Sequence, residues 1–484
     1  MAALLVIGPA SEWRVAAQTL LSWSAQARVP GYDPFALTPY LIADQNRTVH
    51  AFNTVQLAGQ QAIVYSRWIP GQGWTAKPRD ILLPQVRNQI RLQDVAPDRA
   101  GTVHLLFFSG DDAAANIYYA SAPLSQAGDS YAWTTPKVVG ELARTPDEAA
   151  LVINSKNQLF ALYSGRAKGA GLYFTYSTDQ GATWSEPSPM FLTYGSGSFP
   201  FFLRMYVDGQ DGIHALWNVN NSSGLSEAFY YAKLEAGQTE WRDPVQFEAG
   251  GLNAPALVAY EGELILVYQA DSENGLTRYM RRSSDGGASW TEPVRLFPHV
   301  GSNGPASFAV DSANVLHMFF GNRITGRDGT AVHGMWHTVW NGAGWEPPQA
   351  IVSGPPVVDD VGGNGFDPSF ANAVISQGNV ALVTWRSDPA AGANGVWYSY
   401  AILDTPELPV SPLPAQPAVA GALPVGPAAT PTPLPDQAAS NLNVGWSEAA
   451  PAGNPVAPVI TGSAVAVLFV VVIVVGRGML LRRR

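Results

Sequence analysis

The sequence predicts an all-β fold, a β-propeller built from four-stranded blades. Three observations predict it: an eight-residue turn pattern occurs twice, a tryptophan recurs at a regular spacing, and the same succession of short apolar strands fills each interval. A period of about 50 residues is typical of a four-stranded blade. The composition agrees, because 47 Gly, 38 Pro and only 14% charged residues suit many short strands joined by tight turns.

The turn pattern is Ser-x-Asp-x-Gly-x-(Thr/Ser)-Trp, followed by Glu-Pro. Its positions are Ser177, Asp179, Gly181, Thr183 and Trp184 in the first copy, and Ser283, Asp285, Gly287, Ser289 and Trp290 in the second. The Asp carboxylate can accept hydrogen bonds from the backbone of its own turn, and the Gly can adopt a positive φ. The Trp supplies a large apolar ring that fixes the turn against a neighbour. We therefore expect two tight hairpin turns.

This pattern resembles the Asp box of the sialidase-type, or BNR-repeat, β-propellers. In that family the box is structural and lies away from the active site. The resemblance implies a sialidase-like propeller that acts on terminal sialic acid or a related acidic sugar, and it implies six blades.

Each interval carries the same strands in the same order. First strands are predicted at 39–43, 149–153, 255–259 and 305–309. Second strands are predicted at 49–52, 103–107, 159–163, 213–217, 264–268, 316–320 and 380–385, and third strands at 63–65, 117–119, 172–176, 229–231, 278–280, 335–337 and 396–400. The second and third strands thus occur seven times, which favours seven blades.

The fourth, Trp-bearing strand follows only six of the seven sets. Its tryptophans, separated by 59, 51, 57, 49 and 55 residues, are Trp74, Trp133, Trp184, Trp241, Trp290 and Trp345. We expect the N-terminal segment Ser11–Arg14, which resembles Thr239–Arg242, to supply the missing strand. Closing the ring in this way removes an exposed sheet edge. Six blades remain the alternative.

Beyond the propeller, predicted for residues 1–404, the composition changes twice. Residues 405–457 are rich in Pro and Ala and predict an extended, disordered stalk. Residues 458–476 are apolar, and the basic tail 477–484 follows them. This order predicts a single-pass transmembrane helix in the cell membrane, with the propeller outside and the C-terminus in the cytoplasm. The alternative is a buried core helix.

The overall charge excludes some functions. A net charge of −10 and a pI near 5.2 argue against nucleic acid as a partner. The absence of cysteine excludes disulfides, thiolate metal sites and a Cys nucleophile. The repeated histidines occupy the same strand position in four blades and so cannot meet at one metal: they are His50, His104, His214 and His317. We expect neither a metal nor a cofactor.

Candidate binding residues lie on the end of the ring opposite the Asp-x-Gly turns. Loops between second and third strands of three blades carry Arg166, Arg323 and Arg386. A guanidinium binds a carboxylate through two hydrogen bonds, and the sialidase resemblance implies an arginine cluster for the sialic acid carboxylate. The alternative is that each arginine is a solvated loop residue paired with a nearby Asp.

Candidates for catalysis are weaker. Asp367 is the candidate acid, and Tyr32 and Tyr194 are candidate nucleophiles, because the resemblance implies a tyrosine nucleophile. The Arg-Ile-Pro signature of the family is represented only by Arg67-Trp-Ile-Pro70, which has an extra residue and lies on the other end of the ring. Two functions remain open: an exo-glycosidase, or a non-catalytic propeller, presented on the stalk, that binds a carbohydrate, a protein or another cell-surface ligand.

Overall fold

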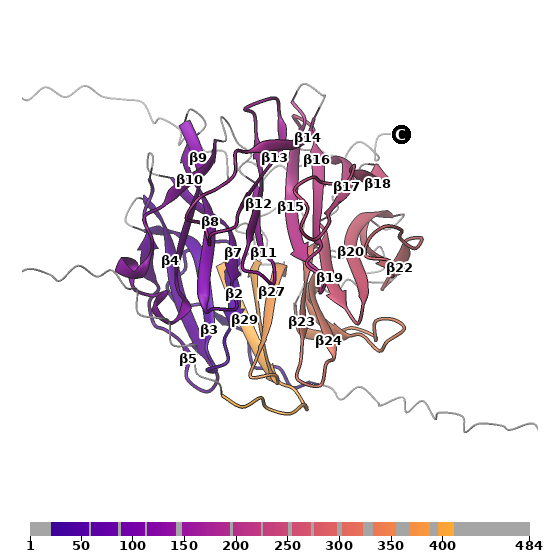
Figure 1. Ribbon diagram of the computed structural model, residues 1–484. Helices are drawn as coiled ribbons and strands as arrows, with labels where there is room; N and C mark the ends of the chain where they lie inside the picture. The colour runs from indigo at the N-terminus through magenta and orange to yellow at the C-terminus, as the bar shows by residue number, and fades with distance from the viewer. Residues whose placement is uncertain are drawn as a thin grey trace, which may run out of the picture. The chain divides into compact units, whose positions relative to one another are not determined.

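The propeller is built from seven antiparallel sheets of at least four strands each (Figure 1). A computed structural model describes residues 21–57, 60–85, 89–111, 114–141, 148–193, 197–223, 226–249, 254–272, 275–297, 303–322, 333–354, 368–387 and 395–410. Each sheet is one blade, so the prediction of seven blades is confirmed and the six-bladed alternative is wrong.

The blades follow one another along the chain and are numbered I to VII here. Blade I comprises β2 (Tyr40–Ala43), β3 (Val49–Leu57), β4 (Gln60–Ile69), β5 (Gly73–Trp74) and β6 (Arg79–Leu82). Blade II comprises β7 (Ile90–Pro97), β8 (Thr102–Asp111), β9 (Ala114–Pro123) and β10 (Lys137–Glu141), and blade III comprises β11 (Ala149–Ile153), β12 (Leu159–Gly165), β13 (Gly171–Ser177) and β14 (Ser188–Leu192).

Blades IV to VII repeat this order. Blade IV comprises β15 (Phe199–Val207), β16 (Ile213–Asn220), β17 (Ser226–Leu234) and β18 (Val245–Ala249), and blade V comprises β19 (Ala256–Tyr260), β20 (Glu263–Ser272), β21 (Gly275–Ser283) and β22 (Val294–Leu296). Blade VI comprises β23 (Asn303–Val310), β24 (Leu316–Asn322), β25 (His333–Val339) and β26 (Gln349–Gly354), and blade VII comprises β27 (Pro368–Ser376), β28 (Val380–Ser387), β29 (Gly395–Ile402) and β1 (Ala27–Arg28).

The first strands of the blades form the innermost layer. Each contacts the first strand of the next blade, and β27 of blade VII contacts β2 of blade I (Figure 1). This contact closes the ring around a central channel. Connections between second and third strands, and between blades, lie at one end of the channel, the loop face. The other connections lie at the opposite end, the turn face.

The N-terminal segment completes blade VII, as predicted, but through different residues. Ala27 pairs with Tyr398 in the sheet, and the Ser24 amide donates to the Tyr400 carbonyl at 2.8 Å. The segment expected to do this, Ser11–Arg14, lies outside the described residues. Trp23 takes the tryptophan position of blade VII instead.

Trp23 contacts the preceding blade, as the tryptophans of most other blades do. Its ring lies 6.2 Å from that of Phe319 and 5.7 Å from that of His337, both in blade VI. Trp184 contacts Tyr119 of blade II in the same way, with ring centroids 5.3 Å apart. A tryptophan at each blade junction therefore fixes neighbouring blades to each other.

These tryptophans precede the fourth strand and, in most blades, do not belong to it. Trp184 lies before β14, and Trp290 lies before β22. The prediction of a Trp-bearing fourth strand was wrong in this respect. The ring is turned toward the preceding blade, and the chain enters its own sheet only after the Pro that follows.

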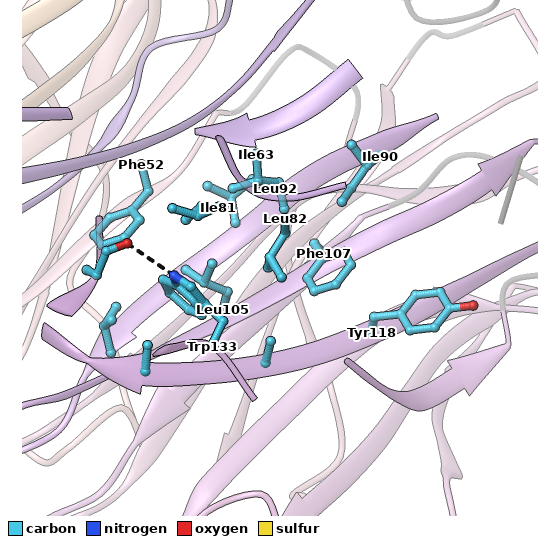
Figure 2. Close-up of a cluster of buried hydrophobic side chains, with 14 of the residues drawn as sticks. Phe52, Ile63, Ile81, Leu82, Ile90, Leu92, Leu105, Phe107, Tyr118 and Trp133 are labelled. Carbon is cyan, nitrogen blue, oxygen red and sulfur yellow. Dashed lines mark hydrogen bonds between the residues drawn. The ribbon is translucent and has the colours of Figure 1, made fainter. Parts of the chain in front are cut away.

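Figure 2 shows the apolar layer between blades I and II. Phe52 of blade I meets Trp133 of blade II edge to face, with ring centroids 6.3 Å apart. The Trp133 indole N–H donates to the Ala127 carbonyl at 3.1 Å, so its polar atom is satisfied inside the cluster. Fully buried aliphatic side chains such as Ile63 and Leu105 fill the remaining space. Such close packing fixes the angle between the blades.

Helix is scarce in the described residues, which contain the two short 3₁₀ turns Leu124–Gln126 and Ser130–Ala132. Within the described ranges no helix has the length and apolar character needed to cross a membrane. The predicted stalk, transmembrane helix and basic tail, with the exception of residues 405–410, lie outside the described residues. The described residues all belong to one compact unit, Met1–Pro414.

The two Asp-x-Gly turns connect third and fourth strands on the turn face. Asp179 Oδ1 accepts from the Thr183 amide at 2.8 Å, and Asp179 Oδ2 accepts from the Thr183 hydroxyl at 2.6 Å. Asp285 makes the same two bonds to Ser289, at 2.9 and 2.5 Å. Hydrogen bonds from Thr183 lower the pKa of Asp179 below its ordinary value. Gly181 has a φ of +83°, which a side chain would strain.

The repeated histidines link a different set of turns, those between first and second strands, to the third strands of their blades. His214 Nε2 lies 3.0 Å from Asp208 Oδ2, and its Nδ1 lies 2.8 Å from the Tyr231 hydroxyl. His50 and His104 have the same two neighbours in their blades, with Nδ1 to tyrosine distances of 2.9 and 2.7 Å. Each histidine is therefore paired within its own blade, as expected of a repeat feature.

Blade VI has a variant of this Asp–His–Tyr arrangement, which we call the relay. His317 Nε2 lies 3.2 Å from Asp311, but His337 replaces the tyrosine, with its Nε2 2.8 Å from His317 Nδ1. Burial and the neighbouring His317 lower the pKa of His337 to about 3. Burial also lowers the pKa of His317 and of His214, despite the adjacent carboxylates.

We predict that Trp23→Ala lowers the free energy of unfolding by about 2–3 kcal/mol, because a half-buried indole is removed from the junction of blades VI and VII. Urea unfolding followed by tryptophan fluorescence measures the loss. Trp13→Ala is the matched control. A larger loss from Trp13→Ala than from Trp23→Ala would contradict the assignment of Trp23 to the closing position.

We predict that stability falls as the pH drops below about 6.5. A histidine with a lowered pKa stays neutral in the folded state, so the unfolded chain takes up the proton first. The contribution is complete above the unfolded value of 6.5 and is lost toward the folded value of about 3 for His337. His337→Tyr restores the Asp–His–Tyr relay of the other blades. Between pH 7 and 5, this variant should lose about 2 kcal/mol less of its free energy of unfolding than the wild type does.

Urea midpoints at pH 7 and 5 measure this effect. The reciprocal change Tyr231→His serves as the control and should make the protein more acid-sensitive. An unchanged pH dependence in His337→Tyr would show that His337 does not carry it.

Candidate functional site

The predicted arginines occupy unlike environments. Arg166 follows β12, is exposed, and borders a hollow of about 10 Å³, which holds about one water molecule. Arg386 lies within β28 and is only 6% exposed. Arg323 lies outside the described residues. The two arginines that are described therefore differ in solvent access, and the cluster of three stays a prediction.

The predicted catalytic residues are only partly described. Tyr194 and Asp367 lie outside the described residues. Tyr32 is a half-buried residue of the segment between β1 and β2, and burial raises the pKa of its hydroxyl. A raised pKa disfavours the phenolate, which a nucleophilic tyrosine requires.

A tyrosine and a glutamate do meet elsewhere in the fold. The Tyr268 hydroxyl donates to Glu248 Oε1 at 2.7 Å, and Arg281 Nη2 lies 3.1 Å from the same oxygen. The Tyr268 side chain is fully buried, however, and burial raises its pKa. The group joins blade IV to blade V, and only its Glu248 and Arg281 side chains reach solvent, at 29% and 15% exposure.

A different set of polar side chains gathers along the innermost strands of the ring. Tyr40 pairs with Phe52 in blade I, Asp94 with Leu106 in blade II, and Arg204 with Leu216 in blade IV. Each of these partners follows the histidine of its blade by two residues. Tyr40, Asp94 and Arg204 therefore lie at the same height of the channel, on innermost strands of three blades.

Electrostatic interactions indicate that these groups lie near one another. Burial alone would lower the pKa of Arg204, but Tyr40, Glu148, Tyr206 and Asp94 together raise it. Burial also raises the pKa of Tyr40, and the charge of Asp94 adds to this effect. We name these five residues, Tyr40, Asp94, Glu148, Arg204 and Tyr206, the channel cluster. They come from blades I, II and IV and from the segment that leads into blade III.

Arg204 is the cation at the centre of the cluster. Its Nη1 donates to the Leu203 carbonyl at 2.7 Å, and it forms no ion pair within 4.0 Å with any carboxylate of the described ranges. Its side chain is partly exposed. A permanently charged guanidinium with free donors and some solvent access is suited to an anionic ligand.

Asp94 combines a structural bond with an unusual acidity. Its Oδ2 accepts from the Leu151 amide of blade III at 2.8 Å, and its Oδ1 accepts from the Val95 amide at 2.8 Å. Burial outweighs these bonds and raises the pKa of Asp94 to about 6. A carboxyl group with this pKa can both hold and release a proton near neutral pH.

None of the residues of the channel cluster was predicted from the sequence as a site residue. Its members lie in first strands, or next to them, where other blades carry apolar residues such as Leu151 and Leu257. A charged residue inside a predicted innermost strand, as in Phe-Leu-Arg204-Met-Tyr, was the available signal. The meeting of blades I and IV across the ring could not be read from the sequence.

The sequence matches no family model, and no curated protein is significantly similar to it. Solved structures do resemble the fold. An ulvan lyase, described as a new family of polysaccharide lyase and bound to -[GlcA(1-4)Rha3S]-, is 11% identical; the likeness covers 79% of this chain and 96% of the lyase, with a TM-score of 0.50.

Two sialidases are also similar in structure, at lower TM-scores. The NanB sialidase from Streptococcus pneumoniae is 11% identical over 80% of this chain and 70% of its own, with a TM-score of 0.43. The intramolecular trans-sialidase from Ruminococcus gnavus is 14% identical over 81% of this chain and 98% of its own, with a TM-score of 0.42. The chain is thus a seven-bladed β-propeller, and the ulvan lyase resembles it in fold.

Proposed function

We propose that this propeller binds an acidic glycan in its central channel, with Arg204 holding the carboxylate of the sugar. The observation that carries the proposal is the position of Arg204: a partly exposed guanidinium on an innermost strand that forms no ion pair within 4.0 Å with a described carboxylate, although Glu148 and Asp94 lie near enough to raise its pKa. A sugar carboxylate would supply that charge through two parallel hydrogen bonds. This assignment replaces none of the predicted loop arginines, which remain candidates for the outer part of the site.

The neighbouring side chains support a sugar ligand. Tyr40 and Tyr206 keep their protons, because their pKa values are raised. The Tyr40 hydroxyl already donates to the Gln93 carbonyl, so it can accept from a sugar hydroxyl, whereas Tyr206 can donate to one. A cluster of one cation, two phenols and carboxylates therefore presents both donors and acceptors. The ulvan lyase that resembles the fold is bound to a unit containing GlcA, which is itself an acidic sugar.

Cleavage of the bound glycan is the second candidate function, and Asp94 favours it. A general acid works best when its pKa lies near the working pH, and that of Asp94 is about 6. The tyrosines of the cluster do not favour a covalent mechanism, because raised pKa values make them poor nucleophiles.

We predict that Arg204→Gln weakens binding of acidic glycans by about 10- to 100-fold, because a charge-assisted hydrogen-bonded pair is lost. A glycan array followed by calorimetric titration of the best ligand measures the change. Arg99→Gln, at an exposed position on the turn face, is the matched control and should bind as the wild type does.

The same ligands distinguish the two candidates. Turnover that disappears in Asp94→Asn while binding persists would establish cleavage, and binding without turnover would leave a binding module. An array on which the wild type retains no acidic glycan would refute both. Binding that Arg204→Gln leaves intact would move the site away from the channel.

We further propose that the chain is anchored in the cell membrane by residues 458–476, with the propeller outside. The apolar run and the arginines that follow it support this orientation. In cell fractionation, the full chain should remain with membranes after a carbonate wash, and a chain ending at Pro414 should be released. Protease added outside intact cells should remove the propeller of the full chain. Full recovery of the full chain in the soluble fraction would contradict the proposal.

A further inference from the structure

Two phenylalanines with unusual backbone conformations meet across the channel. Phe202 of β15 and Phe370 of β27 have φ angles of +51° and +53°, in the left-handed region that bulky side chains rarely adopt. Their ring centroids are 6.4 Å apart, although they belong to blades IV and VII. The two innermost strands therefore direct aromatic rings toward each other inside the ring.

The same local feature produces both conformations. The pairing register of β15 shifts between Phe201 and Arg204, and that of β27 shifts between Ser369 and Asn372. Extra residues at such bulges bend the strand and redirect its side chains. In both blades the phenylalanine lies within the bulge, so the bulge directs its side chain toward the phenylalanine of the other blade.

Neighbouring groups complete an aromatic surface. Phe201 lies 4.5 Å from Phe202, and Phe199 lies 6.5 Å from Phe201, measured between ring centroids. Phe199, Phe201 and Phe370 are partly exposed, and Phe202 is 8% exposed. Gly304 allows the backbone of blade VI to lie close to the backbone of blade VII at Phe370, because a Cβ on residue 304 would lie 3.0 Å from the Phe370 amide nitrogen.

Strain of this kind persists only where surrounding contacts enforce it, and it is often found at ligand-binding sites. Phe202 lies two residues before Arg204 on the same strand and nearer to the loop face. A ligand that enters from the loop face thus meets the aromatic rings before the guanidinium. Sugar rings present an apolar face of C–H groups, which packs on an aromatic ring.

We infer that Phe201 and Phe370, supported from behind by the buried Phe202, form a stacking surface for a pyranose ring, which sets the orientation of the glycan whose carboxylate reaches Arg204. This inference rests on the proposed function. It specifies the substrate class as a uronic or other acidic pyranose that has one face free of axial hydroxyl groups. The aromatic rings select the face of the sugar, and Arg204 selects its charge.

The test compares an acidic sugar with its neutral analogue, in which the carboxylate is reduced to a hydroxymethyl group. Phe370→Gly removes the ring at a position where Gly adopts the observed φ freely. It should weaken binding of both sugars by the same factor, about tenfold. Arg204→Gln should weaken only the acidic sugar. Tyr131→Ala, which removes an aromatic ring that is 96% exposed, controls for nonspecific aromatic contact.

Phe370→Asn is the second variant, because Asn tolerates the left-handed region and keeps the site measurable if the glycine variant unfolds. Wild-type binding that depends on Arg204 but is unchanged in Phe370→Gly and Phe370→Asn would overturn the stacking surface and leave the proposed function standing. Loss of the acidic sugar alone in the phenylalanine variants would also overturn it. Absence of any wild-type binding would overturn both.

Discussion

The contact between a blade and the tryptophan of the next blade, repeated at most junctions, is the interaction on which the ring depends. Trp184 contacts Tyr119, Trp290 contacts Tyr231 and Trp74 contacts Tyr398, each across a blade junction. A closed ring leaves no junction unfilled, so the junction of blades VI and VII must also receive a tryptophan. The N-terminal segment provides it as Trp23, which places the first described residues of the chain beside β24 and β25.

The repeat made most of this fold predictable. Apolar strands and a tryptophan recur in every blade, and an Asp turn recurs in four of them, so one blade identifies the others. The closing segment was assigned to Ser11–Arg14 because Glu-Trp-Arg resembles a sequence in blade IV. The spacing was the better guide: Trp23 precedes Trp74 by 51 residues, the same interval that separates Trp133 from Trp184. The number of residues that a blade requires therefore identifies the closing segment better than the similarity of a three-residue sequence does.

The site was much less predictable, because it depends on departures from the repeat. Loop arginines were visible in the sequence, since loops are where binding residues usually lie. Arg204 and Tyr40 were not, because each lies in a short apolar strand that reads as core. They are 164 residues apart in the chain and interact only because blades I and IV face the same channel. That proximity follows from the number of blades and from the closure of the ring.

A charge that departs from the repeat does not by itself make a site, as Arg278 shows. It occupies the strand position that is apolar in the other six blades: Ile63, Ile117, Leu172, Phe229, Met335 and Val396. Arg278 is 1% exposed, and its Nη2 donates to the carbonyls of Gly304 and Gly321 in blade VI. Burial lowers its pKa to about 9, so it still carries its charge at neutral pH.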